Sequence, residues 1–151
     1  MMDEEVFIDT WGWLALGHRK NAHHQQIKTF YQTLQARGAH LYTSDYVIDE
    51  IITLLFRREV FEEAVHFMEG IFLAAEQGGL TVERVTSERF TSTWRLRKRF
   101  QDKPKISFTD LTSMVIMEER GIRQIITEDE HFHHVGMGFQ KVPEFYSTSY
   151  K

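Results

Sequence analysis

The stretch Val6–Leu16, VFIDTWGWLAL, places one carboxylate, that of Asp9, inside a run of apolar and aromatic residues. β-Branched and aromatic residues dominate its first four positions, which predicts a short buried strand over 6–9. A charged group in such a segment is costly to bury unless it is paired or binds something. Asp9 is therefore either a capping residue where a strand ends or part of a cation site completed from further along the chain.

Outward from this stretch, short strands alternate with helical patterns. Strands of three to five residues between helices indicate an α/β domain with a short, mainly parallel sheet and helices on both faces. Ser87 is expected to cap the fourth of the helices. The helices are predicted over about 24–37, 46–58, 60–77, 87–100 and 108–120, with a helical turn near 128–132, and the further strands over 40–44, 80–85, 123–127 and 138–142.

The composition bounds the class of protein. A chain of 151 residues, 42% hydrophobic and 26% charged, suits a single globular domain over 1–151. Its apolar runs are shorter than the roughly 18 residues of a membrane span, and its acidic start lacks the basic region of a signal peptide. The absence of cysteine excludes disulfides and thiolate metal sites, and fits a cytoplasmic protein. A net charge of −4 means that nucleic-acid binding would depend on a local patch.

Acidic residues recur where ligands bind in such folds. In an open parallel sheet, the binding crevice lies outside the carboxyl ends of the strands. Candidate ligands are Asp9 at the end of the first strand, Asp129 just after the strand at 123–127, Asp110 at the start of the helix at 108–120, and Glu50 in the helix at 46–58.

Glu50 has an acidic neighbour, Asp49, so the two must be told apart. Side chains on a helix contact those three and four positions away. These neighbours are mostly apolar for Glu50 and more polar for Asp49. We therefore expect Glu50 to face the protein interior and Asp49 to face water.

The alternative for these acids is a structural one. SFTD (Ser107–Asp110) and TEDE (Thr127–Glu130) both match the capping-box pattern, and acids are favoured in the first turn of a helix anyway. Each acid taken alone is more readily a cap or a surface charge than a ligand. Four acids at one edge of a fold, however, would repel one another and take up protons unless a cation neutralised them. Ligation by oxygen alone suits Mg²⁺ or Mn²⁺.

The sequence also resembles the PIN-domain family, and within it the VapC-type toxins of bacterial toxin–antitoxin pairs, over nearly its whole length. The matching segments are VFIDTWGWLAL, TSDYVIDEIITLL, ISFTDLTSMVIMEERGI and QIITEDEHF, the last of which fits the T-x-D-x-x-F ending of the family. Each motif alone is weakly specific, whereas their order and spacing together are informative.

This resemblance implies a PIN-like three-layer fold and a Mg²⁺- or Mn²⁺-dependent endoribonuclease, the toxin of a toxin–antitoxin pair. It further implies an RNA substrate, a cognate antitoxin, a homodimer and antitoxin contacts through the early helices, where exposed aromatics near 11–13 or 56–67 would serve. Thr127 matches a hydroxyl residue beside the last acid, and Ser107 lies where a hydroxyl often precedes the third. The acidic quartet of the family falls on Asp9, Glu50, Asp110 and Asp129.

A basic run, WRLRKRFQDKPK (Trp94–Lys105), precedes the third acidic motif. A solvated helix face is the ordinary explanation of such a run. Its place before Asp110 also suits contacts with RNA phosphates, because an acidic site needs nearby cations to hold RNA. The candidate RNA-binding residues are Arg95, Arg97, Lys98 and Arg99.

Three alternatives remain. A catalytically silent PIN-like scaffold would bind RNA or protein without metal-dependent cleavage. HFHH (His131–His134) suggests zinc, but its spacing does not converge on one helix face, and His131 is instead expected beside the acidic site. Lys103–Pro104 is reminiscent of a phosphoryl-accepting receiver domain, but the acids lie in the wrong places for one.

Overall fold

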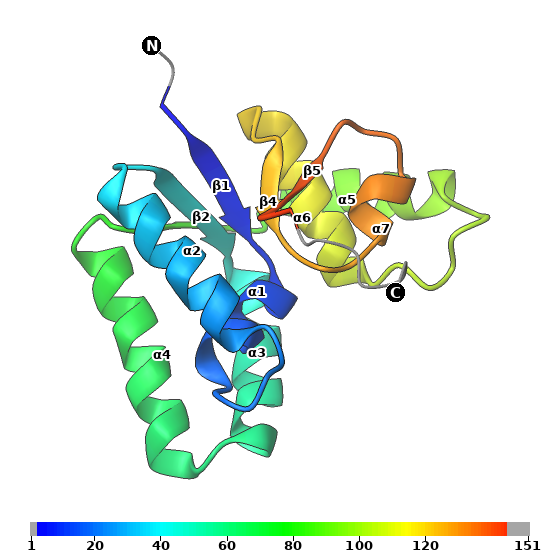
Figure 1. Cartoon of the computed structure of the whole chain (residues 1–151). Helices are drawn as coiled ribbons and strands as arrows, with labels where there is room; N and C mark the ends of the chain where they lie inside the picture. Colours follow the sequence, from blue (N-terminus) through cyan, green and yellow to red (C-terminus); the bar gives the residue numbers. More distant parts are fainter. Residues whose placement is uncertain (1–2, 145–151) are drawn as a thin grey trace, which may run out of the picture.

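A five-stranded parallel sheet forms the centre of the molecule in a computed structural model that describes residues 3–144 (Figure 1). Its order is β3-β2-β1-β4-β5, and all four pairings are parallel. The first strand of the chain is therefore the middle strand of the sheet. The strands are β1 (Glu5–Ile8), β2 (His40–Ser44), β3 (Thr81–Glu83), β4 (Gln124–Ile126) and β5 (Gln140–Val142).

Seven helices flank this sheet in the described part of the chain. Figure 1 shows two groups, α1 to α4 in blue to green and α5 to α7 in green to orange, with the sheet between them. This arrangement confirms the predicted α/β class with helices on both faces. The helices are α1 (Thr10–Gly17), α2 (His24–Ala36), α3 (Asp45–Arg58), α4 (Phe61–Glu76), α5 (Ser87–Arg99), α6 (Phe108–Arg120) and α7 (His131–His134).

The apolar residues of the central strand explain why this sheet needs helices on both sides. Val6, Phe7 and Ile8 are fully buried, so side chains on both faces of β1 are removed from water. Parallel strands are connected by helices that cover both faces, and such strands accordingly carry continuous apolar runs. The longest buried segment lies in α6, where Leu111–Met117 is buried throughout. The α6 helix therefore anchors the side of the molecule that carries Asp110.

One helix, α1, was not anticipated from the sequence. It starts directly after β1, is eight residues long and buries five of them, so no polar face marks its helical period. Gly12 lets it approach the sheet closely, because a Cβ atom there would come within 2.8 Å of the Ile126 carbonyl oxygen. The expected cap at Ser87 was also wrong by one residue. Thr86 caps α5, with its hydroxyl accepting the backbone N–H of Arg89 at 3.2 Å.

In the described part of the chain, none of the helices combines the length and the apolar character that crossing a membrane would require.

Candidate active site

Asp9 sits at the junction of β1 and α1, at the carboxyl edge of the sheet. It is the N-cap of α1, and its Oδ1 accepts the backbone N–H of Gly12 at 2.9 Å. The capping prediction is thus correct, but it does not account for the surroundings of this side chain. Asp9 is only 3% exposed. A cap elsewhere on the surface would be solvated, so the burial of this carboxyl needs a second explanation.

Thr127 connects Asp9 with Asp129. Pairing of Ile8 with Ile126 sets the ends of β1 and β4 side by side. The buried hydroxyl of Thr127 donates to the carboxyl of Asp9 and accepts the backbone N–H of Asp129 at 3.0 Å. The strand register and one hydroxyl group therefore fix the relative positions of the first and the last predicted acid.

Asp110 reaches the same edge from the first turn of α6. Ser107 is the N-cap of this helix, and its hydroxyl accepts the backbone N–H of Asp110 at 3.0 Å. Ser107 therefore orients the first turn of α6 through the backbone, and the side chain of Asp110 is left for the site. That side chain is 13% exposed.

Glu50 comes from α3. Its Oε1 accepts the hydroxyl of Thr10 at 2.5 Å, and the residue is half-buried, whereas Asp49 is exposed. This is the orientation expected from their helix neighbours. Thr10 itself was missed in the sequence, although a hydroxyl residue directly after the capping Asp9 was a visible signal.

The four carboxylates act on one another electrostatically. Burial raises the pKa of Asp9 to about 7, and the charges of Asp129 and Glu50 add to this effect, while hydrogen bonds from Thr127 and Gly12 oppose it. Burial likewise raises the pKa of Asp110 to about 8, with further contributions from Asp9, Asp129 and Glu50. Both carboxyls therefore favour the protonated form near neutral pH unless a cation compensates their charge.

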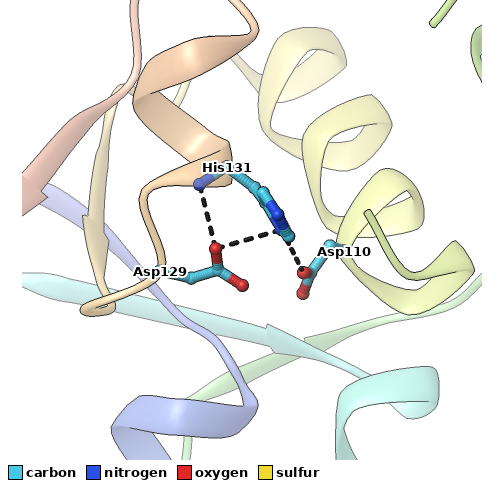
Figure 2. A group of neighbouring side chains, drawn as sticks. All are labelled: Asp110, Asp129 and His131. Carbon is cyan, nitrogen blue, oxygen red and sulfur yellow. Dashed lines mark hydrogen bonds and ion pairs between the residues drawn. The ribbon is translucent and has the colours of Figure 1, made fainter. Parts of the chain in front are cut away.

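A histidine completes the cluster. Figure 2 shows His131 at the start of α7 with its ring between Asp129 and Asp110. Its Nδ1 lies 3.1 Å from Asp129 Oδ1 and 3.9 Å from Asp110 Oδ2, and its backbone N–H donates to Asp129 Oδ1 at 2.9 Å. His131 thus flanks the acidic site, as expected.

The donor set fits a divalent cation. One ligand atom each from Asp110, Asp129 and His131 lie within 4.8 Å of one another. The Nδ1 atom of His131 is buried and lacks a well-aligned hydrogen bond within the described residues. The donor set is two carboxylates and one imidazole, and Asp9 and Glu50 lie close enough to raise the pKa of Asp110. This set suits Mn²⁺ or Mg²⁺, which favour oxygen ligands. Zinc is less suited, because carboxylates dominate the cluster and the other histidines of α7 lie outside it.

Comparison with known proteins agrees with this arrangement. A sequence model of the PIN domain matches residues 6–137. The chain belongs to the PIN-domain family. It is similar to the 23S rRNA-specific endonuclease VapC20 of Mycobacterium tuberculosis, from both strain CDC 1551 / Oshkosh and strain H37Rv, with 31% identity over 131 residues that cover 87% of this chain and 94% of the relative.

A solved structure supports the same relationship. The crystal structure of Mycobacterium tuberculosis VapC20, described as a sarcin–ricin loop cleaving toxin, matches with a TM-score of 0.77 and 31% identity. The match covers 91% of this chain and 98% of that chain. The predicted PIN-like fold and the predicted family, with its VapC-type branch, are thereby confirmed.

The predicted RNA-binding run divides between two sides of α5. Arg95 and Arg99 line a pocket of about 380 Å³ together with Glu118 and Glu119, near the far end of α6 from Asp110. Lys98 is exposed on another side of the helix. The basic run is therefore not one continuous patch beside the acids.

Arg97 differs from its neighbours, because its guanidinium is engaged within the protein. It is half-buried, and its guanidinium donates to the carbonyl oxygens of Ile106 at 2.7 Å, Phe100 at 2.8 Å and Lys103 at 2.7 Å. These bonds commit Arg97 to the loop between α5 and α6. The sequence could not show this, because the path of that loop depends on how the two helices cross.

Trp13 packs in the core and is not part of an exposed aromatic surface. It is 2% exposed, and its Nε1 donates to the hydroxyl of Thr43 at 2.9 Å. That hydroxyl in turn donates to the carbonyl of Ile8 at 2.9 Å. Trp13 therefore joins α1 to the central sheet. Of the second expected region, Phe61 is 66% exposed and Phe67 is half-buried.

Proposed function

We propose that this chain is a Mg²⁺- or Mn²⁺-dependent endoribonuclease and the toxin of a toxin–antitoxin pair. One observation carries the proposal. Four acids from separate elements converge at the carboxyl edge of the sheet, and the pKa values of Asp9 and Asp110 are raised to about 7 and about 8. Such a charge excess is costly for a fold and useful for holding a cation.

Asp110 and Asp129 would hold the cation together with His131, and Asp9 would add its charge from the end of β1. When bound, it would supply charge stabilisation at the scissile phosphate and a water of lowered pKa. Glu50, oriented by the hydroxyl of Thr10, would add its negative charge to the site. Thr127 keeps Asp9 and Asp129 in register, so that the ligands are positioned before the substrate arrives.

The relatives favour a nuclease over a catalytically silent scaffold. VapC20 is named as an endonuclease, and this chain matches it over 94% of its length. All four acids of the family pattern are present here. We propose RNA phosphodiesters as the substrate class, and a hairpin that carries a sarcin–ricin loop is a rational first substrate.

The partners follow from the same proposal. A groove of about 570 Å³ lies between α1, α2 and α4, with Trp13, Tyr31 and Phe67 among its lining residues. We propose this groove, in which aromatic side chains are combined with polar ones, as the place where a cognate antitoxin binds. A homodimer in the cytoplasm is the expected working state.

The decisive assay combines purified protein, single-stranded RNA and Mn²⁺, with EDTA as a control. Asp9→Asn should abolish cleavage while the fold is retained, since asparagine keeps the α1 cap but removes the negative charge. Asp110→Asn should do the same. Asp49→Asn is the matched control and should cleave like the wild type, because Asp49 is exposed.

Two outcomes would count against the nuclease. Undiminished cleavage by the Asp9 variant would mean that contaminating activity or another site is responsible. Failure of the wild type to cleave any RNA with either ion would move the scaffold ahead. Expression in bacteria supplies a second readout, in which the wild type should slow growth and the Asp9 variant should not.

A further inference from the structure

A pocket of about 290 Å³ shares His131 with the acidic site. One wall is the loop at 102–106, which joins α5 to α6, and the other consists of His131 and His134 of α7. The Nδ1 atom of His131 faces the carboxylates of Asp110 and Asp129 (Figure 2), and the same residue lines the pocket. The pocket is therefore adjacent to the acidic cluster.

The loop wall brings positive charge to this pocket. Lys103 and Lys105 line it, together with Asp102. The Nζ of Lys103 lies 2.9 Å from Asp102 Oδ2 and 5.6 Å from the centre of the Phe100 ring; the lysine side chain is 28% exposed and the carboxylate 74%. Exposed ion pairs contribute little stability, so Lys103 can exchange this partner for a phosphate at small cost. Lys105 is exposed.

Arg97 fixes the shape of this loop. Its guanidinium donates to three carbonyl oxygens, those of Phe100, Lys103 and Ile106, at 2.7–2.8 Å. These bonds span the segment that carries both lysines. A loop that is already ordered loses less conformational entropy when it binds a ligand. Arg97 is thus placed to position the lysines without contacting the ligand itself.

The other basic pocket is a poorer candidate for holding a phosphate. Arg95 and Arg99 share it with two acids, Glu118 and Glu119. Those acids lie in the last turns of α6, whereas Asp110 lies in the first turn. A phosphate there would meet opposing charge and would be distant from the acidic cluster.

We infer that the pocket between the 102–106 loop and α7 binds an RNA phosphate that flanks the scissile one. The inference rests on the proposed nuclease function, because a scissile phosphate beside Asp110 and Asp129 places the next phosphate of the strand on the other side of His131. Lys103 and Lys105 supply the charge, and His134 supplies a ring nitrogen. Lysines bind phosphate as point charges, so this subsite contributes affinity without reading sequence.

The test compares two double variants that each remove two positive charges. Binding of a short, labelled single-stranded RNA is titrated in EDTA, which prevents cleavage, at several salt concentrations. Lys103→Ala/Lys105→Ala should weaken binding and lower the slope of log affinity against log salt by about 1.4, at about 0.7 per lost contact. Arg95→Ala/Arg99→Ala is the matched control and should leave the slope unchanged. Equal slopes for the wild type and the lysine variant, or a loss confined to the arginine variant, would overturn the inference.

A second arm separates this inference from the nuclease proposal. With Mn²⁺, the lysine variant should show a raised KM and an unchanged kcat, since it loses binding that the ground state and the transition state share. If the wild type does not cleave but the salt slopes differ as expected, the nuclease proposal fails, and the pocket stands as an RNA-phosphate site without a scissile phosphate beside it. If the wild type cleaves and the slopes are equal, the nuclease stands and the subsite is wrong.

Arg97→Lys tests the positioning step. Lysine keeps the charge but cannot donate three bonds in a forked geometry. This variant should lose RNA affinity, whereas Arg95→Lys should not, with thermal unfolding to show that both variants are folded. Wild-type affinity in a folded Arg97→Lys protein would contradict the role of Arg97.

Discussion

Two charged clusters at the carboxyl edge of the sheet have opposite composition. In the first, beside the edge strand β3, Glu83 (11% exposed) lies 2.9 Å from Arg89 and 3.6 Å from Arg120, and Arg89 also pairs with Glu119 at 3.1 Å. In the second, at the ends of β1 and β4, acids and hydroxyls surround Asp9 and Asp110, and His131 lies beside Asp110. The first cluster balances its own charge, and the second does not. This difference separates a structural ion-pair network from a site that requires a cation from outside.

The largest expected effect comes from unbalancing the first cluster. Arg89→Ala removes the ion pairs to Glu83 and Glu119 and the bond from Arg89 to the Arg84 carbonyl at 2.8 Å. Loss of one partner of a largely buried pair is costly, and we expect a loss of about 3 kcal/mol in the free energy of unfolding. Urea denaturation measures this directly.

The matched change in the acidic cluster should have a different outcome. Asp110→Asn removes a carboxyl whose ionised form is disfavoured by burial and by the neighbouring acids, so in EDTA it should leave stability unchanged or raise it. If Asp110→Asn were as destabilising as Arg89→Ala, the acids would serve mainly as structural caps, and the contrast between the two clusters would be lost.

The acids at this edge could be anticipated because strand ends have a chemical signature. A carboxylate that closes an apolar strand, as Asp9 closes β1 and Asp129 follows β4, meets its counterparts wherever parallel strands are neighbours. Helices with one polar face were also predictable, because their apolar residues recur at helical spacing. The eight-residue helix α1 was not, because it is apolar on every side and its period is invisible in the sequence.

Contacts that depend on how helices cross were beyond the sequence. Six basic residues within Trp94–Lys105 look like one patch in the sequence. In the structure, Arg95 and Arg99 line a pocket with Glu118, whereas Arg97 donates to carbonyl oxygens of the loop between α5 and α6. Residue type predicted charge here, but only the three-dimensional path of the chain decided what each charge contacts.

The next effect in size is a pH dependence confined to the acidic cluster. Since the pKa values of Asp9 and Asp110 are raised from 3.8 to about 7 and about 8, the folded protein binds more protons than the unfolded chain in that window. The contribution of these two carboxyls to the free energy of unfolding is therefore fully present below pH 3.8. It is lost as the pH rises through their pKa values in the folded protein.

Thermal or urea unfolding between pH 4 and pH 8, in EDTA and in Mn²⁺, checks this. A bound cation should flatten the dependence, because it replaces the protons and also stabilises the folded state by mass action. Asp110→Asn should reduce the slope in EDTA, whereas Arg89→Ala should lower the whole curve and keep its shape. A flat curve in EDTA, or identical curves with and without Mn²⁺, would mean that the two clusters do not differ in the way proposed.

The smallest expected effect concerns the orientation of Glu50, which is held by a hydroxyl group. Arginine nitrogens fix Glu83, whereas a hydroxyl, that of Thr10, holds Glu50 at 2.5 Å. Thr10→Val keeps the shape of the side chain and removes that donor. The net loss of stability should be about 1 kcal/mol. A misaligned Glu50 should lower kcat by about tenfold, or 1.4 kcal/mol, with little change in KM.

Thr10→Ser is the control, because it restores the donor and omits only a methyl group. Equal kcat in the serine and the wild-type protein, with a loss confined to valine, would show that the hydroxyl aims the carboxylate. Equal losses in both variants would assign the effect to packing around the buried Thr10, and unchanged kcat in the valine variant would remove Glu50 orientation from the catalytic argument. A hydroxyl suits this position for a physical reason. It orients one carboxylate and adds no positive charge, so the negative potential that attracts a cation to Asp9 and Asp110 is preserved.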